Sequence, residues 1–465
     1  MSANSIDKDQ LFFSPKNGYD RLNETEIARL FEYAEGYKVF MDEGKSERDA
    51  IDWAVARAEA SGFHAYHRGD AIKPGDRLYV NNRGKTLYLA VIGLQPLSHG
   101  MHMAAGHIDA PHIHIKPHPF YEESEMGYMK THYYGGIRKY QWVTIPLEMR
   151  GVIALKDGTV KHIDIGRTPG DPLFTMTDLL PHLGKEQDEK PLSKGIEAEQ
   201  LNLLIGSRPL ANTHGTDRVK HALLKLFNEK FGVTEEDFIS AELDIVPAFP
   251  ACDIGLDRSL VGAFGHDDRV CCYTALTAIL ETVNPIKTAV SVLVDKEEVG
   301  SNGVTSMRSE AFYTFIEDLC ESQGVLARAC YERSFCLSAD VCAAYDPTFP
   351  DVYEKRNAAF LNYGPGVAKY LGARGKSGAS DASAESIAYL RRVFDKADVA
   401  WQLVELGKMD VGGGSTVGAF IANKNIDTVD IGVPVLSMHA PFETISKLDL
   451  YMTHKAFAAV FASAE

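Results

Sequence analysis

Apolar and polar positions in the first quarter of the chain predict helices followed by strands. Residues 25–60 are rich in Ala, Glu, Leu and Tyr and predict helices. The segment RLYVNNRGKTLYLAVIG (77–93) predicts a β-hairpin that turns at Asn82-Arg83-Gly84. The segment HMAAGHIDAPHIHIKP (102–117) alternates in character and predicts one further strand.

The pattern changes between about residue 118 and residue 245. The segment WVTIPLEMRGVIALKDGTVKHIDIG (142–166) predicts strands joined by a hairpin turn at Asp157-Gly158. Polar loops that contain proline follow it. We therefore interpret the middle of the chain as an inserted, β-rich domain.

Beyond residue 250, apolar strand-like runs alternate with helix-like segments. The expected order is helix 268–283, strand 288–294, helix 307–321, strand 334–341, strand 399–406, a helix after Gly414, strand 428–436 and helix 445–463. Such alternation favours an α/β fold in which helices flank a mixed sheet. We expect this domain to comprise residues 1–115 and 246–465, with the inserted domain at residues 116–245.

Composition narrows the class of protein. A chain of 465 residues is too long for one ordinary core, which agrees with two domains. The net charge of −16 argues against nucleic acid or an anionic membrane as a partner. No apolar run approaches a membrane span, and the N-terminus lacks a signal-peptide pattern. The seven cysteines lack CxxC spacing, which predicts reduced thiols in a cytoplasmic protein.

Side chains that bind divalent cations follow several of the predicted strands. They are His107 and Asp109 in AGHIDAPH, Asp267 and Asp268 in FGHDDRV, Glu297 and Glu298 in KEEVG, Asp340 in LSADVCAA and His439 in LSMHAPFE. Ligands gather at the carboxyl ends of strands in open α/β sheets, so we expect these distant segments to converge. This set of nitrogen and oxygen donors favours zinc or a similar divalent ion.

A hydrolytic site with two metal ions needs a bridging carboxylate, further ligands on each ion and a free carboxylate beside the attacking water. Asp267 can supply the bridge. The remaining ligands are then His107 and Asp340 on one ion, and Glu298 and His439 on the other. Asp268 is the alternative to Asp267.

The adjacent acids Glu297 and Glu298 follow an apolar run at 292–294. Neighbours on an extended chain point to opposite sides, so one acid can bind metal while the other moves a proton. We assign metal binding to Glu298 and the general-base role to Glu297. Asp109 suits a supporting role, in which it accepts the second N–H of His107. A solvated acidic turn is the other common use of two adjacent glutamates.

Several of these segments together resemble the aspartyl aminopeptidase and vacuolar aminopeptidase I family of cocatalytic zinc metallopeptidases. The resemblance covers nearly the whole chain and rests on GHIDAPHIHIKP, YGGI (134–137), HDDRV, KEEVGS, SAD, GGGSTVG (412–418) and SMH. It implies metal ligation by His107, Asp267, Glu298, Asp340 and His439, and the base role for Glu297. The ions would be two Zn²⁺ per subunit, with Co²⁺ or Mn²⁺ as alternatives.

The same resemblance implies a zinc-exopeptidase-like catalytic domain interrupted by a dimerisation domain, and a tetrahedral homododecamer built from dimers. The segment LLPHL (179–183) matches a family segment whose His reaches a neighbouring subunit's active site, so His182 is a candidate for catalysis in trans. Lys369, in GPGVAK, is a candidate substrate-binding residue for an acidic side chain or a peptide carboxylate. Family members with acidic preference carry a His where this chain has Ala343, which argues against strict aspartyl specificity.

Three functions remain to be compared. An aminopeptidase acting on peptides is the leading hypothesis. A metal-dependent deacylase or carboxypeptidase on the same plan, and an inactive shell-forming scaffold, are the alternatives. The presence of Glu297 together with all five ligands argues against a scaffold, and peptides blocked at the amino end separate the two enzymes.

Three further histidines, His112, His114 and His118, lie in the same stretch as His107. They raise the hypothesis of a second metal site. The alternative is a strand that carries solvated or hydrogen-bonded histidines on its polar face.

Overall fold

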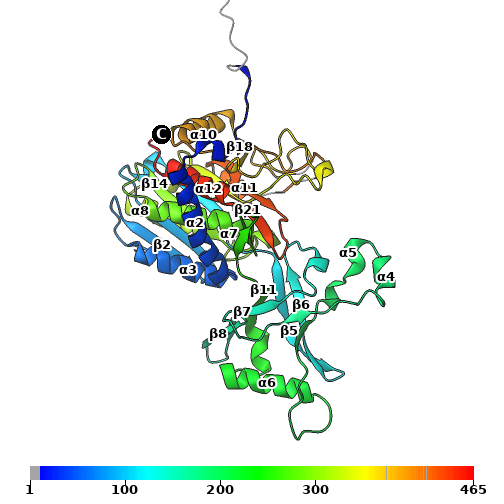
Figure 1. Cartoon of the computed structure of the whole chain (residues 1–465). Coiled ribbons are helices and arrows are strands. Elements are labelled where there is room, and N and C mark those ends of the chain that lie inside the picture. Colours follow the sequence, from blue (N-terminus) through cyan, green and yellow to red (C-terminus); the bar gives the residue numbers. More distant parts are fainter. Residues whose placement is uncertain (1–10, 373, 412, 415) are drawn as a thin grey trace, which may run out of the picture.

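The computed structural model describes residues 11–372, 374–411, 413–414 and 416–465 (Figure 1). Two positions of the GGGSTVG segment, Gly412 and Ser415, lie outside the described residues, as do residues 1–10, where no signal peptide was expected. Three sheets of nine, seven and five strands organise the described chain. The strands and helices of the seven-stranded sheet lie apart from the main body, at the lower end of Figure 1.

The nine-stranded sheet is mixed and forms the centre of the larger domain. In spatial order its strands are β1 (His64–Ala65), β2 (Arg77–Asn82), β3 (Thr86–Val91), β14 (Thr288–Val294), β4 (Met101–His107), β15 (Phe335–Ala339), β19 (Asp427–Gly432), β17 (Gly366–Ala368) and β18 (Gln402–Leu403). The neighbours β14, β4, β15 and β19 run parallel, so their carboxyl ends lie at one edge. Every residue of β14, β4 and β15 is buried, as expected for parallel strands covered on both faces.

Helices cover both faces of this sheet. One face packs against α2 (Glu24–Glu43), α3 (Glu47–Ala60), α7 (His266–Glu281), α10 (Ala384–Lys396) and α12 (Lys447–Phe461). The other face packs against α8 (Ala311–Ser322), α9 (Ala327–Tyr331) and α11 (Gly418–Ala422). The predicted mixed sheet flanked by helices is therefore confirmed.

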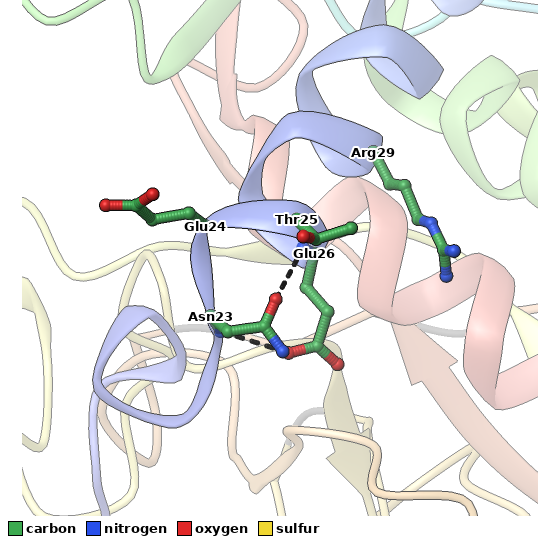
Figure 2. A pocket seen from close by; sticks show the side chains of 5 residues that line it. All are labelled: Asn23, Glu24, Thr25, Glu26 and Arg29. Carbon is green, nitrogen blue, oxygen red and sulfur yellow. Dashed lines mark hydrogen bonds between the residues drawn. The ribbon is translucent and has the colours of Figure 1, made fainter.

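Helix α2 begins with a capping box (Figure 2). The side chain of Asn23 accepts the backbone N–H of Glu26 at 3.0 Å, and the side chain of Glu26 accepts the backbone N–H of Asn23 at 3.0 Å. The shallow hollow beside this cap is lined by Asn23, Glu24, Thr25, Glu26 and Arg29. These residues all belong to the helix start, and we assign no binding role to the hollow.

The seven-stranded sheet is antiparallel and forms the inserted domain. In spatial order its strands are β8 (Val160–Ile165), β7 (Leu147–Ala154), β11 (Ala241–Pro247), β5 (His112–Glu123), β6 (Met126–Tyr134), β10 (Leu203–Gly206) and β9 (Thr175–Met176). Helix α6 (Arg218–Phe231) packs against it, and the short helices α4 (Lys185–Asp188) and α5 (Leu192–Gly195) lie in the connection from β9 to β10. The sheet begins at His112 and ends at Pro247, so it extends beyond the predicted boundaries at residues 116 and 245.

The segment 102–117, predicted as one strand, forms two strands in different sheets. Strand β4 ends at His107 in the nine-stranded sheet, and β5 begins at His112 in the seven-stranded sheet. Pro111 lies between them and has no N–H to donate to a ladder. The prediction of a single strand was therefore wrong, and the chain crosses between the two sheets over residues 108–111.

The five-stranded sheet lies in the larger domain. Its strands are β12 (Cys252–Ile254), β13 (Leu260–Ala263), β21 (Glu443–Ser446), β20 (Pro434–Leu436) and β16 (Cys342–Ala343). Strand β13 leads into Asp267, β16 follows Asp340, and β20 and β21 flank His439. This sheet therefore holds three segments that carry predicted metal ligands.

The cysteines form no disulfide. All seven are free, and five of them are buried. The thiol of Cys272 donates a hydrogen bond to the carbonyl of His107 at 3.0 Å.

Among the described residues, no helix has the length and apolar character that crossing a membrane requires.

Candidate metal centre

The predicted metal ligands come from segments that meet at one edge of the nine-stranded sheet. His107 is the last residue of β4, and Asp340 directly follows β15. Glu297 and Glu298 form a short 3₁₀ turn, Glu297–Val299, after β14. Because β14, β4 and β15 run parallel, these side chains emerge at the same edge.

Asp267 lies between the two histidines. One of its carboxylate oxygens is 3.3 Å from His107 Nε2, and the other is 3.1 Å from His439 Nε2. His107 Nε2 also lies 3.6 Å from Asp340 Oδ1, and His439 Nε2 lies 3.5 Å from Glu298 Oε1. The arrangement has the pairing that two metal ions sharing one carboxylate require.

Two overlapping groups of these residues can each hold an ion. Donor atoms of His107, Asp267 and Glu298 lie within 4.8 Å of one another, and so do donor atoms of His107, Glu297 and Asp340. Glu297 therefore lies beside the ligands, at a distance at which it can serve either as a ligand or as a base.

The site contains buried acceptor atoms without partners. Oδ1 of Asp267 and Oε1 of Glu298 are buried and accept no hydrogen bond. An unpaired buried carboxylate oxygen is costly, and a bound cation removes that cost. The donor set of imidazole nitrogens and carboxylate oxygens fits zinc, and it also fits Co²⁺ or Mn²⁺.

Negative charge dominates the site. The carboxylates of Asp109, Asp267, Glu297, Glu298 and Asp340 surround the imidazoles of His107 and His439. Burial lowers the pKa of His439, but its contact with Asp267 and the charge of Glu298 outweigh burial and raise the pKa to about 10. Two divalent cations would compensate this excess of negative charge.

Glu297 is half-buried and is the acid that we assign to proton transfer. Burial raises its pKa to about 7, and the charges of Asp340 and Asp109 act in the same direction against that of His107. A bound cation would lower this pKa again by stabilising the carboxylate. With cations bound, Glu297 would therefore be a carboxylate that can accept a proton.

The imidazole of each histidine is oriented by a backbone carbonyl. His107 Nδ1 donates to the carbonyl of Asp109 at 3.0 Å, and His439 Nδ1 donates to the carbonyl of Gly136 at 2.8 Å. Both rings therefore present Nε2 to the site. The YGGI segment (134–137) supplies the acceptor of the second bond, because it places Gly136 beside the centre.

Asp109 was expected to hold His107 through its carboxylate. Its Oδ1 is 3.5 Å from His107 Nδ1, so the backbone carbonyl is the closer acceptor. The carboxylate instead accepts the backbone N–H groups of Glu297 and Glu298 at 3.1 and 3.2 Å, and the hydroxyl of Tyr134 at 2.8 Å. Asp109 therefore positions the two acids more directly than it positions His107.

Two supporting residues, Tyr134 and Glu443, were missed from the sequence. Glu443 is buried and accepts the backbone N–H of His439 at 2.6 Å and that of Asp267 at 3.1 Å. The only sequence signal for it was an acid at the end of LSMHAPFE. Tyr134 reaches Asp109 from the other sheet, which no local pattern reveals.

Asp268, the alternative bridge, faces another way. One of its oxygens lies 3.3 Å from the backbone nitrogen of His107, and it is absent from both ligand groups among the described residues. Burial, together with the charges of Asp340 and Asp267, raises the pKa of Asp268 well above its ordinary value, against the charge of His107.

His182 and Lys369 belong to neither group of candidate ligands among the described residues. Both are exposed, and within the described part of the chain neither forms a hydrogen bond or ion pair with the residues of the centre. His182 is in a turn of the inserted domain, and Lys369 directly follows β17.

The chain matches known proteins along most of its length. Residues 40–461 match the family model described as aminopeptidase I zinc metalloprotease (M18). A protein from Clostridium acetobutylicum named probable M18 family aminopeptidase 1 is 45% identical over 453 residues, which cover 96% of this chain and 97% of that protein.

Solved structures agree with this match. The crystal structure of an M18-family aminopeptidase from Thermotoga maritima has a TM-score of 0.93 at 39% identity, and covers 97% of this chain and 99% of its own. That of aminopeptidase I from Clostridium acetobutylicum has a TM-score of 0.91 at 42% identity, and covers 97% and 100%. The chain therefore belongs to the aminopeptidase I family of zinc metalloproteases, the M18 family.

Proposed function

We propose that this chain is a metal-dependent aminopeptidase that hydrolyses the N-terminal residue from peptides with a water activated by two divalent ions. The position of Asp267 carries the proposal, because its two oxygens face two histidines at 3.3 and 3.1 Å. Such a carboxylate can bridge two ions and serve both at once. Membership of the aminopeptidase I family supports the same reaction.

The ligands divide into two sets around the Asp267 bridge. His107 and Asp340 would hold one ion, and Glu298 and His439 would hold the other, in keeping with the distances of 3.6 and 3.5 Å within these pairs. Zn²⁺ bound there would lower the pKa of a water and polarise the scissile carbonyl.

Glu297 is the residue to which we assign proton transfer. It accepts the proton of the attacking water and returns it to the leaving amine. Its backbone N–H donates a hydrogen bond to Asp109 at 3.1 Å, and this bond holds the turn in place. Asp109 is thus a positioning residue, since it acts through Glu297 and Glu298.

Peptides with free and blocked amino ends test the reaction. We expect release of the N-terminal amino acid from free peptides and from aminoacyl amides, and no reaction with N-acetylated versions. Glu297→Gln should lower kcat by about 10³-fold, because the amide keeps the shape but accepts no proton.

Metal analysis on the same samples provides the control, since Glu297→Gln should keep its metal. Hydrolysis of the acetylated peptides, or of the C-terminal bond, would point to the deacylase or carboxypeptidase alternative. Activity of Glu297→Gln near that of the parent would exclude Glu297 as the base.

Two ligand variants test the bridge. Asp267→Ala should retain two fewer ions per subunit than the parent, because the bridge serves both ions. His439→Ala should retain one fewer, because it serves a single ion. Elemental analysis after exhaustive dialysis measures both numbers, and a loss of one ion from Asp267→Ala would mean that the bridge is another residue.

The hydroxyl of Tyr134 offers a test of positioning across the two sheets. Tyr134→Phe keeps the ring but removes the donor to Asp109, and we expect kcat to fall by about tenfold with KM and metal content near those of the parent. Tyr133→Phe, at the neighbouring and more exposed position of β6, is the matched control. Equal effects of the two substitutions would remove Tyr134 from this role.

We also propose that the protein assembles into a tetrahedral homododecamer built from dimers, in the cytoplasm. Leu179, Leu180 and Leu183 expose 54%, 50% and 68% of their surfaces beside His182, which gives the inserted domain an apolar surface for contact between subunits. A yeast structure with the same fold, a TM-score of 0.76 and 19% identity is a dodecamer. The seven unpaired cysteines support a reducing compartment.

Two exposed residues complete the proposal. His182 would enter the active site of a neighbouring subunit and donate a hydrogen bond to the oxyanion of the tetrahedral intermediate, a contribution of about 3 kcal/mol. Lys369 would contact an acidic side chain or the peptide carboxylate of the substrate. The exposure of both side chains in the single chain supports roles that depend on a partner.

Mixed assemblies test the role of His182. Glu297→Gln subunits and His182→Ala subunits should each be nearly inactive alone, with the metal content of the parent. Reassembled together they should recover activity, because an intact His182 on the first type can serve an intact Glu297 on the second. Turnover of the mixture no higher than the average of its components would exclude action between subunits.

A further inference from the structure

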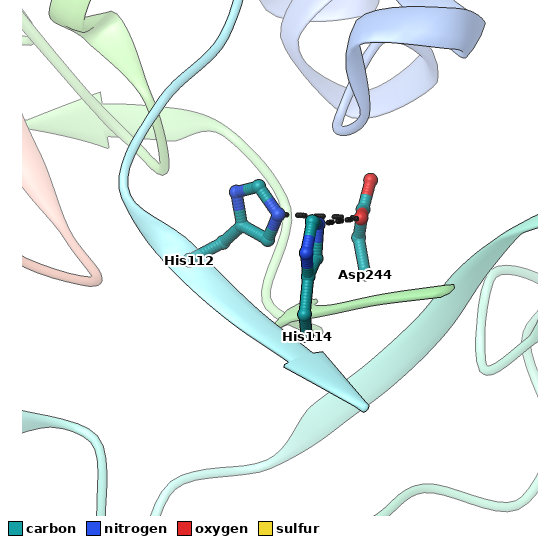
Figure 3. A group of neighbouring side chains, drawn as sticks. All are labelled: His112, His114 and Asp244. Carbon is teal, nitrogen blue, oxygen red and sulfur yellow. Dashed lines mark ion pairs between the residues drawn. The ribbon is translucent and has the colours of Figure 1, made fainter. Parts of the chain in front are cut away.

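A second group of metal-binding side chains lies outside the candidate metal centre, at the start of the inserted sheet (Figure 3). His112 is the first residue of β5, and His114 lies two positions later on the same face. Asp244 of β11 is the cross-strand partner of His114. Figure 3 shows both rings extending toward the Asp244 carboxylate.

The donor atoms of this group converge. Oδ1 of Asp244 lies 3.2 Å from His112 Nε2 and 2.8 Å from His114 Nε2, and one donor atom from each residue lies within 4.8 Å of the others. Both Nε2 atoms are buried, and neither contact has the geometry of a hydrogen bond. His112 is 3% exposed and Asp244 is 4% exposed, so both side chains are largely shielded from solvent.

The hydrogen bond made by the other ring nitrogen of His112 shows why its contact with Asp244 needs a positive charge. Its Nδ1 donates to the carbonyl of Ala110 at 2.7 Å, which leaves the lone pair of a neutral ring on Nε2. That lone pair faces the anionic oxygen of Asp244. A positive charge between them, either a proton or a metal cation, is needed to make the contact favourable.

No other cation in the described chain pairs with Asp244. Its ion pairs are those with His112 and His114. The nearby guanidinium of Arg269 donates instead to the carbonyls of Ile108 and Lys45, at 3.2 and 2.9 Å. The buried carboxylate therefore lacks the strong cationic partner that buried acids normally have.

We propose that His112, His114 and Asp244 form a third divalent-metal site, separate from the catalytic pair. Two imidazole nitrogens and one carboxylate oxygen are the donors that Zn²⁺ prefers, and a water completes a tetrahedral shell. The Ala110 carbonyl orients one ligand, as carbonyls do at the catalytic centre. The side chain of His114 is 36% exposed, which leaves a path for the ion.

The third site lies where a bound ion would stabilise the support of the two catalytic acids. The ring of Tyr134 stacks on His112, with centroids 4.6 Å apart and planes inclined by 21°. The hydroxyl of the same tyrosine donates to Asp109, which holds the backbone of Glu297 and Glu298. An ion that fixes His112 thus fixes the tyrosine that supports the catalytic acids.

Metal stoichiometry tests the proposal. Protein stripped with a chelator and then dialysed against Zn²⁺ should bind three ions per subunit. His114→Gln should bind one fewer, and its affinity for this ion should fall by at least about 100-fold. His118→Gln, at an exposed position of the same strand outside the group, is the matched control and should bind as many ions as the parent.

The same test in Asp267→Ala subunits, which should lose both catalytic ions, separates the third site from the catalytic metals. In Asp267→Ala subunits one Zn²⁺ should remain, and added Zn²⁺ should raise the melting temperature. Both effects should vanish when His114→Gln is added. Co²⁺ in place of Zn²⁺ should give the visible absorption of a tetrahedral nitrogen and oxygen site, with the same dependence on His114.

Two results would overturn the third site. His114→Gln and His118→Gln could bind the same number of ions, or the Co²⁺ spectrum could be unchanged by His114→Gln. A loss of stability in His114→Gln without any loss of metal would identify the group as a protonated ion pair. The difference between the His114 and His118 variants does not depend on whether the catalytic centre holds two ions.

Discussion

The concentration of carboxylates at the carboxyl ends of three parallel strands is the constraint on which the rest of the structure depends. Asp267, Glu298 and Asp340 lie close together around two histidines, and two of their buried oxygens accept no hydrogen bond. Such repulsion is tolerable only where cations compensate it. The neighbouring helices and the five-stranded sheet hold the ligand segments in place against it, and Glu443 secures two of them through backbone N–H groups.

Asp109 connects this charged cluster with the inserted sheet. Its backbone carbonyl orients His107, and its carboxylate accepts three donors, among them Tyr134 from β6. The inserted domain returns a second contact through the Gly136 carbonyl, which orients His439. The inserted domain thus orients His439 directly and supports Asp109 through the hydroxyl of Tyr134.

The sequence was informative wherever function required an exception to an ordinary pattern. An acid pair at the end of an apolar run marked Glu297 and Glu298, and His107 and Asp340 stood out after buried strands. The crossing between sheets at 108–111 was missed, because the alternation of apolar and polar residues continues through Pro111. Tyr134 and Glu443 were missed because their roles depend on tertiary contacts with residues far along the chain.

The short crossing between β4 and β5 has a consequence for motion. Only residues 108–111 separate His107 from the first strand of the inserted sheet, and Tyr134 and Gly136 contact Asp109 and His439 from the end of β6 and the turn after it. Opening a hinge at this junction would break these contacts and change the geometry of the site. The contacts made by Tyr134 and Gly136 therefore resist hinge motion between the two sheets, because such a motion would break both hydrogen bonds.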